Sequence, residues 1–229
     1  MQDIKLEHRF SKELGLLKNL FGKNAVEPKL SRLNEILRRT EQWWSDNLSR
    51  IPGRRVRYLM ICEAPPWHEE GGIVYVYNPD SRPKGRDPMT EIHKAFFPDE
   101  RIAEGEYGRA LDKIANEGVL IVDSLPFAMD YGNKRSEKEY SRLVKACVES
   151  YLEPKLQNAK IEWHGDSKIA FSLKKNAYEV MKSVGHSLTL GSEGQEVGVT
   201  ESNIGADGSG YPSAREIQRI FGLNGYRTA

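Results

Sequence analysis

Short, continuously apolar runs separated by helix-like stretches constrain the fold of this chain more than any other feature. Three of these runs are clear strand candidates and one is partial: residues 56–62, 119–123, 169–173 and part of 187–199. Helical patterns lie between them, near residues 107–116, 139–156 and 177–184. Apolar strands that alternate with helices are typical of a parallel sheet covered on both faces. We therefore predict a three-layer α/β/α fold with a short central parallel sheet.

The first fifty residues follow a different pattern. Apolar side chains recur at helical spacing through residues 3–49, which predicts two helices, and Pro28 suits the start of the second. Pro52-Gly53 then interrupts the chain. We expect a helical extension over residues 1–52 and an α/β domain over residues 53–229. The extension could grip a duplex, dock a partner or enlarge the core.

The composition excludes several classes of protein. Hydrophobic residues make up 38% and charged residues 29% of the 229 positions, which is ordinary for a globular protein. No apolar run approaches the roughly 18 residues that span a bilayer. The N-terminus lacks the apolar core of a signal peptide. Two cysteines suit a reducing cytosol and cannot supply the four ligands of an iron–sulfur cluster. We expect a cytoplasmic protein without a metal or cofactor.

The positive charge is unevenly placed, although the net charge is only +1. Two groups of cations stand close together in the sequence: Arg50, Arg54, Arg55 and Arg57, and then Arg82, Lys84 and Arg86. Such clusters either track phosphates or decorate solvated loops, and charge patterning alone does not separate the two interpretations.

In a parallel sheet the ligand site lies at the carboxyl ends of the strands, so the segments after the strands are the candidates. The first strand leads into Glu63-Ala64-Pro65-Pro66. This segment is either a firm turn that could hold a ligand or a surface turn with solvated acids. An aromatic stretch with Tyr75 and Tyr77 follows, either a stacking platform or one face of a further strand. The 119–123 strand ends in Asp123, which either caps a turn or contacts a ligand.

A fourth candidate segment lies near the C-terminus. Ser213 and Glu216 form a capping box, which predicts that a helix begins there. Glycine-rich backbone that leads into a helix N-terminus is a natural phosphate seat, and a plain capped helix is the alternative.

In their order along the chain, these segments resemble the signature motifs of the uracil-DNA glycosylase superfamily. Cys62-Glu63-Ala64-Pro65-Pro66 is similar to the GEAPG turn of the bacterial family 4 branch. Tyr75 falls at the aromatic position that stacks on the flipped base, and Asp123 at an asparagine that reads the pyrimidine edge. Tyr211-Pro212-Ser213 resembles the His-Pro-Ser motif, which enters the minor groove.

The resemblance spans about residues 56–222 and implies a DNA glycosylase that binds a flipped nucleotide, without the branch's iron–sulfur cluster. It also places Ala64, Pro65 and Pro66 against the base. Ser213 and Arg215, together with Arg82, Lys84 and Arg86, are the residues that we expect to contact DNA.

Two departures from the family pattern bear on the base that is excised. An asparagine amide both donates and accepts, whereas an ionised Asp123 only accepts, which favours the N4 amino group of cytosine over uracil. A protonated Asp123 would complement N3 of cytosine as well. Pro66 stands where one uracil-specific branch has a tyrosine that excludes C5 substituents. Together these positions predict a C5-modified cytosine, such as the hydroxymethyl or glucosylated bases of bacteriophage DNA, and hence a role in antiviral defence.

Other departures concern the chemistry. Tyr211 replaces the family's histidine, and its phenol can donate to the base O2 as charge develops. Ala64 stands where some branches have a residue that positions water, so we expect Glu63 or Glu69, then Asn78, to take that role. His68, Glu69 and Glu70 lack a recognisable metal-ligand spacing. Two alternatives stay open: a glycosylase for uracil or another deaminated base, and a DNA-binding module of the same fold without catalysis.

Overall fold

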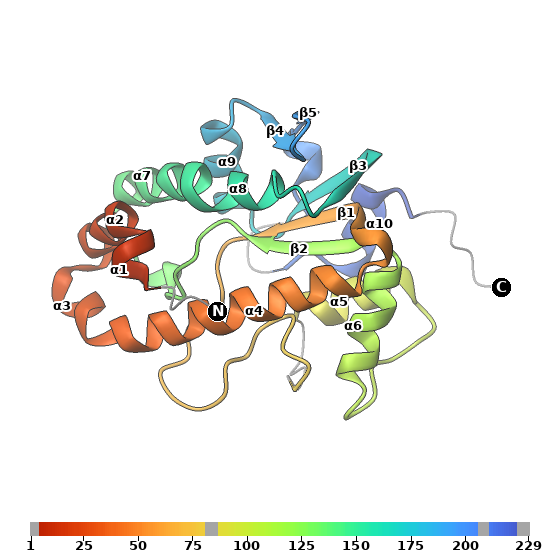
Figure 1. The fold of residues 1–229 in the computed structure, drawn as a ribbon, viewed down its shortest axis with the longest axis horizontal. Helices are drawn as coiled ribbons and strands as arrows, with labels where there is room; N and C mark the ends of the chain where they lie inside the picture. Colours follow the sequence, from red (N-terminus) through yellow and green to blue (C-terminus); the bar gives the residue numbers. More distant parts are fainter. Residues whose placement is uncertain (1–4, 81–86, 206–210, 224–229) are drawn as a thin grey trace.

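A three-stranded parallel sheet forms the centre of the computed structural model, which describes residues 5–80, 87–205 and 211–223. Strand β1 (Arg55–Cys62) lies between β2 (Val119–Asp123) and β3 (Glu162–Phe171), as Figure 1 shows. The β2 strand is buried at every position, as expected of a strand with helices on both sides. These strands confirm the three strand candidates and the α/β/α prediction, although β3 begins seven residues earlier than expected.

The connections between the strands place helices on both faces of the sheet. Helices α5 (Pro88–Phe96) and α6 (Tyr107–Asn116) lie between β1 and β2, whereas α7 (Glu137–Cys147) and α8 (Glu153–Leu156) lie between β2 and β3. Parallel crossovers are right-handed, and these two run in opposite directions along the sheet, so their helices cover opposite faces. In Figure 1, α7 and α8 lie above the sheet, and α6 lies below it.

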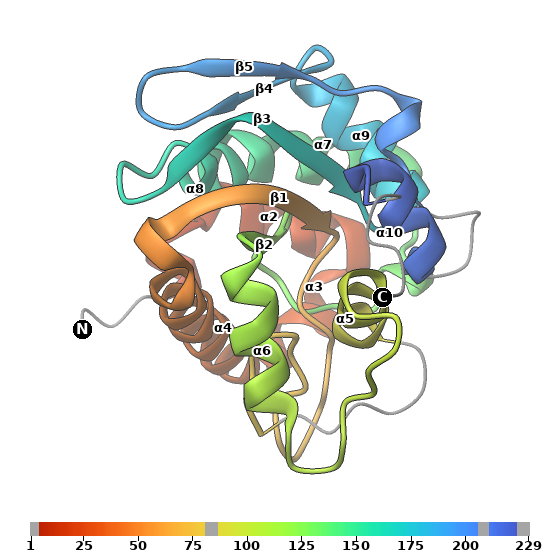
Figure 2. The same cartoon turned by 90° about the vertical axis from the view of Figure 1, so that its right-hand side faces the viewer.

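The fourth strand candidate is a strand over part of its range, but it does not join the parallel sheet. Residues 187–199 instead form an antiparallel hairpin of β4 (Ser187–Leu190) and β5 (Gln195–Gly198), a separate two-stranded sheet outside β3 (Figure 2). Gly191 and Gly194 have positive φ angles in its loop, which only glycine adopts at little cost. Beyond the hairpin, Ile204 lies beside the end of β3 and forms a single parallel bridge with Phe171. Tyr211 comes later in the same stretch of sequence.

The N-terminal region contains one long helix and several short ones. Helix α4 (Leu30–Arg50) follows η1 (Glu27–Lys29), which contains Pro28, and η2 (Pro52–Arg54) leads into β1. The first expected helix is divided into α1 (Leu6–Arg9), α2 (Ser11–Phe21) and α3 (Lys23–Val26). Gly22, at φ +92°, separates α2 from α3. Apolar side chains of these helices join the same buried core as the sheet.

The long helix expected over 139–156 is interrupted. Between α7 and α8, residues Val148–Leu152 form a π-helical turn, η4. Pro154 has no N–H, and its ring clashes with the carbonyl four residues earlier in a regular helix. A π turn relieves that conflict by widening the helix locally.

Helices near the C-terminus lie close to their expected places. Helix α9 (Lys174–Ser183) follows β3, and η5 (Glu201–Asn203) precedes the return segment. Helix α10 (Ala214–Phe221) packs on α5 and β3. Within the described part of the chain, no helix combines the length and the apolar character that a bilayer-crossing segment requires.

Candidate active site

Strand register brings two of the predicted segments together. Cys62 lies opposite Asp123 at the carboxyl ends of β1 and β2. The pairing continues beyond the strands, because the Ser124 N–H donates to the Cys62 carbonyl at 2.8 Å and the Leu125 N–H to the Glu63 carbonyl at 2.9 Å. Two carboxylic acids, Glu63 and Asp123, therefore stand at adjacent strand ends with their backbones fixed by hydrogen bonds.

The main cavity opens at these strand ends and has a volume of about 680 Å³, within the usual range for pockets that hold small organic ligands. Residues far apart in the sequence line it, including six that the sequence analysis singled out: Ala64, Pro66, Tyr75, Asn78, Asp123 and Tyr211. The structure thus gathers the four candidate segments around one space.

Asp123 and Tyr75 form a buried pair in the main cavity. The Tyr75 hydroxyl donates to Asp123 Oδ2 at 2.9 Å, and each side chain is only 4% exposed. Tyr75 lies in a turn and not in a strand, so the alternative of a strand face is wrong. The bond fixes one oxygen of the carboxyl group and holds the phenol against it.

Burial raises the pKa of Asp123 to about 6. The loss of water disfavours its charged form. Lys155 and the Tyr75 hydrogen bond oppose the shift, whereas Glu41 adds to it. A carboxyl group with this pKa changes protonation close to neutral pH. It can then either accept only, or donate one hydrogen bond as well.

A side cavity of about 390 Å³ adjoins the main one. Cys62, Ala64, Pro66 and Tyr211 line both cavities, so there is space on more than one side of the Pro66 ring. Two further motif residues, Glu63 and Pro65, line the side cavity but not the main one. The remaining lining residues of the side cavity are Trp67, Met129, Asp130, Tyr131, Gly132 and Leu173. Burial is the main cause that raises the pKa of Glu63, and the Tyr140 hydroxyl, which donates to Oε1 at 2.5 Å, opposes it.

The three candidates for handling water are not equivalent in the structure. Glu63 faces the side cavity, whereas Glu69 is exposed and lines neither cavity. The Asn78 side chain maintains its own turn. Its Nδ2 donates to the Ile73 carbonyl at 2.7 Å, and its Oδ1 accepts from the Asp80 N–H at 3.0 Å. Glu63 is therefore the candidate whose position suits the role.

Close backbone packing positions Tyr211. A Cβ on Gly205 would lie 2.5 Å from Cβ of Pro212, so only glycine allows the segment beside β3 to approach Tyr211-Pro212 this closely. Burial raises the pKa of Tyr211. Its hydroxyl stays protonated at neutral pH, and the residue lines both cavities.

The capping box at α10 is confirmed, but it occupies the expected phosphate seat. Ser213 Oγ accepts from the Glu216 N–H, and Glu216 Oε2 accepts from the Ser213 N–H at 2.9 Å. The Ala214 N–H donates to Glu91 Oε2 at 2.7 Å. Two carboxylates thus bind the first amides of the helix, whereas the glycine-rich residues 208–210 of the expected phosphate seat lie outside the described residues. Arg215 is exposed beside the capping box.

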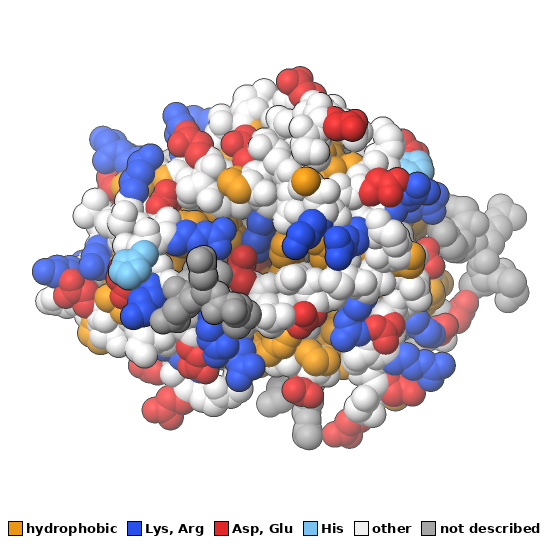
Figure 3. Space-filling model, viewed as in Figure 1, with side chains coloured by type: hydrophobic (Ala, Val, Ile, Leu, Met, Phe, Trp, Pro, Cys, Tyr) orange, Lys and Arg blue, Asp and Glu red, His pale blue; other side chains and the backbone are white. Residues whose placement is uncertain are grey.

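The cationic clusters differ in their relation to the cavities. Arg54, Arg55 and Arg57 lie at the amino end of β1, roughly 20 Å from the cavities at 3.3 Å per strand residue. Arg50 and Arg55 are paired there with Asp112 and Glu162. Arg82, Lys84 and Arg86 lie outside the described residues. On the face in Figure 3, Lys and Arg side chains are interspersed with Asp and Glu.

Helix α4 contributes to the site, which the sequence analysis did not foresee. Trp43 stacks on Tyr75 with ring centroids 6.2 Å apart and planes 21° from parallel. Arg32 donates to the carbonyls of His68 and Gly71, and Lys29 lies over the Trp67 ring. The helical spacing was visible in the sequence, but nothing in it indicated that this face of α4 supports the 67–75 loop.

Other residues at the site were also missed. Asp87, which caps α5, and Tyr107 line the main cavity, and the Asp87-Pro88 pair is a helix-start signal that could have revealed α5. His68 lines the main cavity as well. Its Nε2 is buried and has no partner among the described residues. Within that part of the chain, no three His, Cys, Asp or Glu side chains form a group that could hold a metal ion.

Comparisons of the chain with protein-family models, curated proteins and solved structures give no match. The case for a function therefore rests on the motifs and on the geometry that gathers them around two adjoining cavities.

Proposed function

We propose that this protein is a DNA glycosylase of the uracil-DNA glycosylase type. It flips a nucleotide out of DNA and hydrolyses the N-glycosidic bond, which leaves an abasic site. The observation that carries the proposal is the buried Tyr75–Asp123 pair in a cavity shared with Ala64, Pro66 and Tyr211. These residues come from segments that resemble the motifs of that superfamily.

Each group has a role in the proposed reaction. The flipped base occupies the main cavity against Tyr75 and pairs with Asp123. The bond between C1′ and the base nitrogen breaks, and its electron pair leaves with the base. The Tyr211 hydroxyl donates to the base O2 as negative charge develops. Water attacks C1′ and its proton passes to Glu63, which then releases it to solvent, while the departing base takes up a proton from solvent.

The proposed substrate is a C5-modified cytosine. An Asp123 carboxyl with a pKa near neutral can accept from the cytosine N4 amino group through one oxygen. In its protonated form it can also donate to N3. Space beside Pro66 in both cavities suits a substituent at C5. A cytoplasmic enzyme with this substrate would damage modified bacteriophage DNA and leave unmodified host DNA intact.

An abasic-site assay tests the proposal. Oligonucleotides that carry uracil, cytosine, 5-hydroxymethylcytosine or its glucosylated form, single- and double-stranded, are incubated with protein and cleaved with alkali. We expect cleavage with a modified cytosine only. Cleavage with uracil alone would support repair of deaminated bases and discard the argument from Asp123. Binding without cleavage would point to a DNA-binding module of this fold.

Variants of the acidic residues sharpen the assay. Glu63→Gln should lower single-turnover excision about 100-fold or more, the lower range of general acid–base contributions. Glu69→Gln is the matched control, because the same change falls on an exposed side chain outside both cavities. Asp123→Asn should lose the modified cytosine and gain uracil. An Asp123→Asn protein that keeps its old substrate and gains no uracil activity contradicts the substrate assignment.

A further inference from the structure

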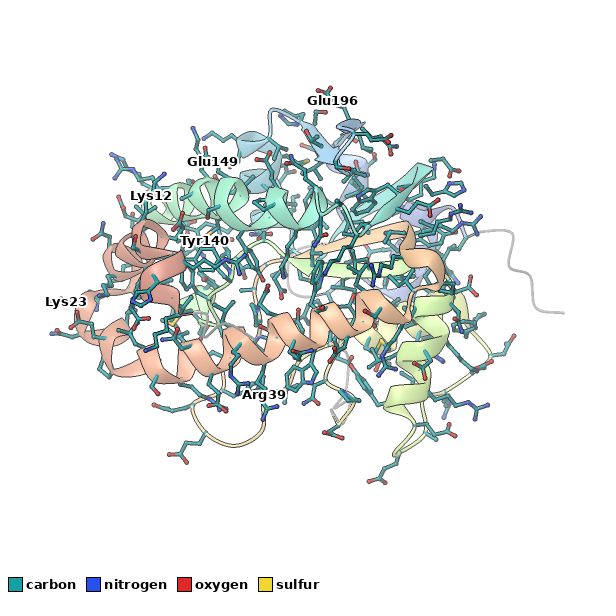
Figure 4. The ribbon with its side chains drawn as sticks, viewed as in Figure 1. Lys12, Lys23, Arg39, Tyr140, Glu149 and Glu196 are labelled. Atoms are coloured by element: carbon teal, nitrogen blue, oxygen red, sulfur yellow. The ribbon has the colours of Figure 1, made fainter. Side chains whose placement is uncertain are left out.

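We propose that Tyr140, held by Asn176, is a positioning residue that aims Glu63 at the reacting water. This inference rests on the proposed function and adds residues that no motif contains. Tyr140 belongs to α7 and Asn176 to α9, two helices that meet at the carboxyl end of the sheet. Figure 4 shows Tyr140 on the side of α7 that faces the interior.

A chain of hydrogen bonds joins these residues to Glu63. The Tyr140 hydroxyl donates to Glu63 Oε1 at 2.5 Å. Asn176 Nδ2 donates to the Tyr140 oxygen at 3.1 Å and to Ser124 Oγ at 2.9 Å. Ser124 Oγ lies 3.0 Å from the Glu63 carbonyl, to which it donates. The side chain of Glu63 and its backbone are thus both tied to the same amide.

The donor and acceptor roles in this series of hydrogen bonds follow from the Asn176 amide. An amide nitrogen has two hydrogens and no acceptor capacity, and its two partners here are the oxygens of Tyr140 and Ser124. Because the Tyr140 oxygen accepts from Asn176, its single hydrogen is left for Glu63. The phenol therefore stabilises the ionised carboxylate, the form that can take a proton from water.

Burial makes this network costly unless it is complete. Tyr140 and Ser124 are 0% exposed and Asn176 is 1% exposed. Buried polar groups lose stability when their partners are missing. The core at this place would pack more simply with apolar side chains. A fully bonded polar chain that ends on a cavity-lining carboxylate fits a role in positioning that carboxylate.

Other charges around Glu63 set the background for its titration. Lys134, Lys175 and the Tyr140 hydrogen bond lower its pKa, whereas burial and Asp130 raise it, with burial the largest cause. Burial is the largest cause that raises the pKa of Tyr131 and Tyr211, and the charge of Glu63 adds to the shift of both. Of these neighbours, Tyr140 has the direct hydrogen bond.

In the reaction this arrangement has a defined task. As the glycosidic bond breaks and its electrons leave with the base, a water oxygen forms the new bond to C1′. The water's proton moves to the carboxylate of Glu63, whose Oε1 is held by Tyr140. Without Tyr140 the carboxylate can rotate, and it takes up a proton at higher pH, so less of the enzyme is competent near neutrality.

The titration of Glu63 tests the inference without reference to activity. Carboxyl-labelled glutamate is followed by ¹³C NMR, with Glu63→Gln to assign the resonance. Tyr140→Phe should raise the Glu63 pKa by about one unit, since a hydrogen bond to a charged group is lost. Tyr131→Phe is the matched control. It removes a buried phenol beside the same cavity, but that phenol donates to the Phe127 carbonyl, so the Glu63 pKa should not move.

Single-turnover excision against pH supplies the functional readout. The acidic limb of the Tyr140→Phe profile should move upward by the same amount as the Glu63 pKa, and the plateau should fall about tenfold. If Tyr140→Phe does not fold, Asn176→Leu gives the same test, because it frees the phenol from its fixed direction. An unchanged Glu63 pKa, or a limb that stays in place while that pKa moves, overturns the inference. A wild-type protein that excises no base refutes the proposed function instead, and the NMR result still decides whether Tyr140 controls Glu63.

Discussion

At the scale of single residues, the two strand-end carboxyl groups are each matched with a phenol. Tyr75 donates to Asp123, and Tyr140 donates to Glu63. Burial raises the pKa of both acids. Positive side chains lie near both acids, but burial outweighs them, so each ionised carboxylate is less stable in the folded chain than in water. Their presence at a cavity wall is therefore a cost in stability that a purely structural residue would not impose.

That cost can be measured for Asp123. Its folded pKa of about 6 lies above the ordinary 3.8, so the native state binds a proton more tightly than the unfolded state. Its contribution to stability is therefore present at low pH and is lost as pH rises from about 4 to 6. Asp123→Asn should raise the free energy of unfolding relative to the wild type by on the order of 1–3 kcal/mol at pH 7.5, and the gain should vanish near pH 4.

Urea unfolding of both proteins across this range gives the result. Asp99→Asn, the same change at an exposed position, is the matched control. A pH-independent difference for Asp123→Asn would mean that this acid titrates normally in the native state.

At the scale of elements, one face of helix α4 supports the candidate site. Trp43 supports Tyr75 from behind, and Glu41 binds the buried Lys155 at 2.6 Å, which in turn acts on the charge of Asp123. The Tyr151 hydroxyl also donates to Glu41 at 2.9 Å. The N-terminal region thus extends the core and stiffens one wall of the main cavity.

Trp43→Leu should therefore reduce excision by about tenfold or more while the protein stays folded, because Tyr75 loses the ring that fixes its plane. Trp163→Leu is the matched control. That tryptophan is also partly buried, with its Nε1 bonded to the Leu156 carbonyl, but it lies near the amino end of β3. Single-turnover rates, together with circular dichroism to verify folding, compare the two. Equal losses would show that the effect is general destabilisation.

The same scale explains what could be predicted from the sequence. The β2 strand and α6 were found at their observed bounds because an unbroken apolar run and a strong helical period are local signals. The 187–199 hairpin was misjudged because its apolar pattern does not reveal which sheet it joins. Tyr140 and Asn176 were invisible for a related reason. Their role depends on contacts 77 and 52 residues away in the chain, with Glu63 and Ser124.

At the scale of the whole molecule, the near-zero net charge limits how the proposed DNA substrate could be held. Each phosphate contact contributes about −0.9 to the slope of log K against log salt. Replacement of Arg82, Lys84 and Arg86 by glutamine should make this slope shallower by up to about 2.7, if each contacts a phosphate. Arg54→Gln with Arg57→Gln, at the far end of β1, should leave it unchanged. Fluorescence anisotropy at several salt concentrations distinguishes the two, and equal effects would place the DNA elsewhere.

The register between β1 and β2 has a consequence for how this protein can change over evolutionary time. Main-chain hydrogen bonds between the two strand ends set the spacing between the Glu63 and Asp123 backbones. Exchange of the side chain at position 123 or 66 therefore leaves this backbone arrangement and Glu63 in place. Under the proposed function, the base that is recognised could change by single substitutions while the proposed hydrolytic residue is inherited unchanged.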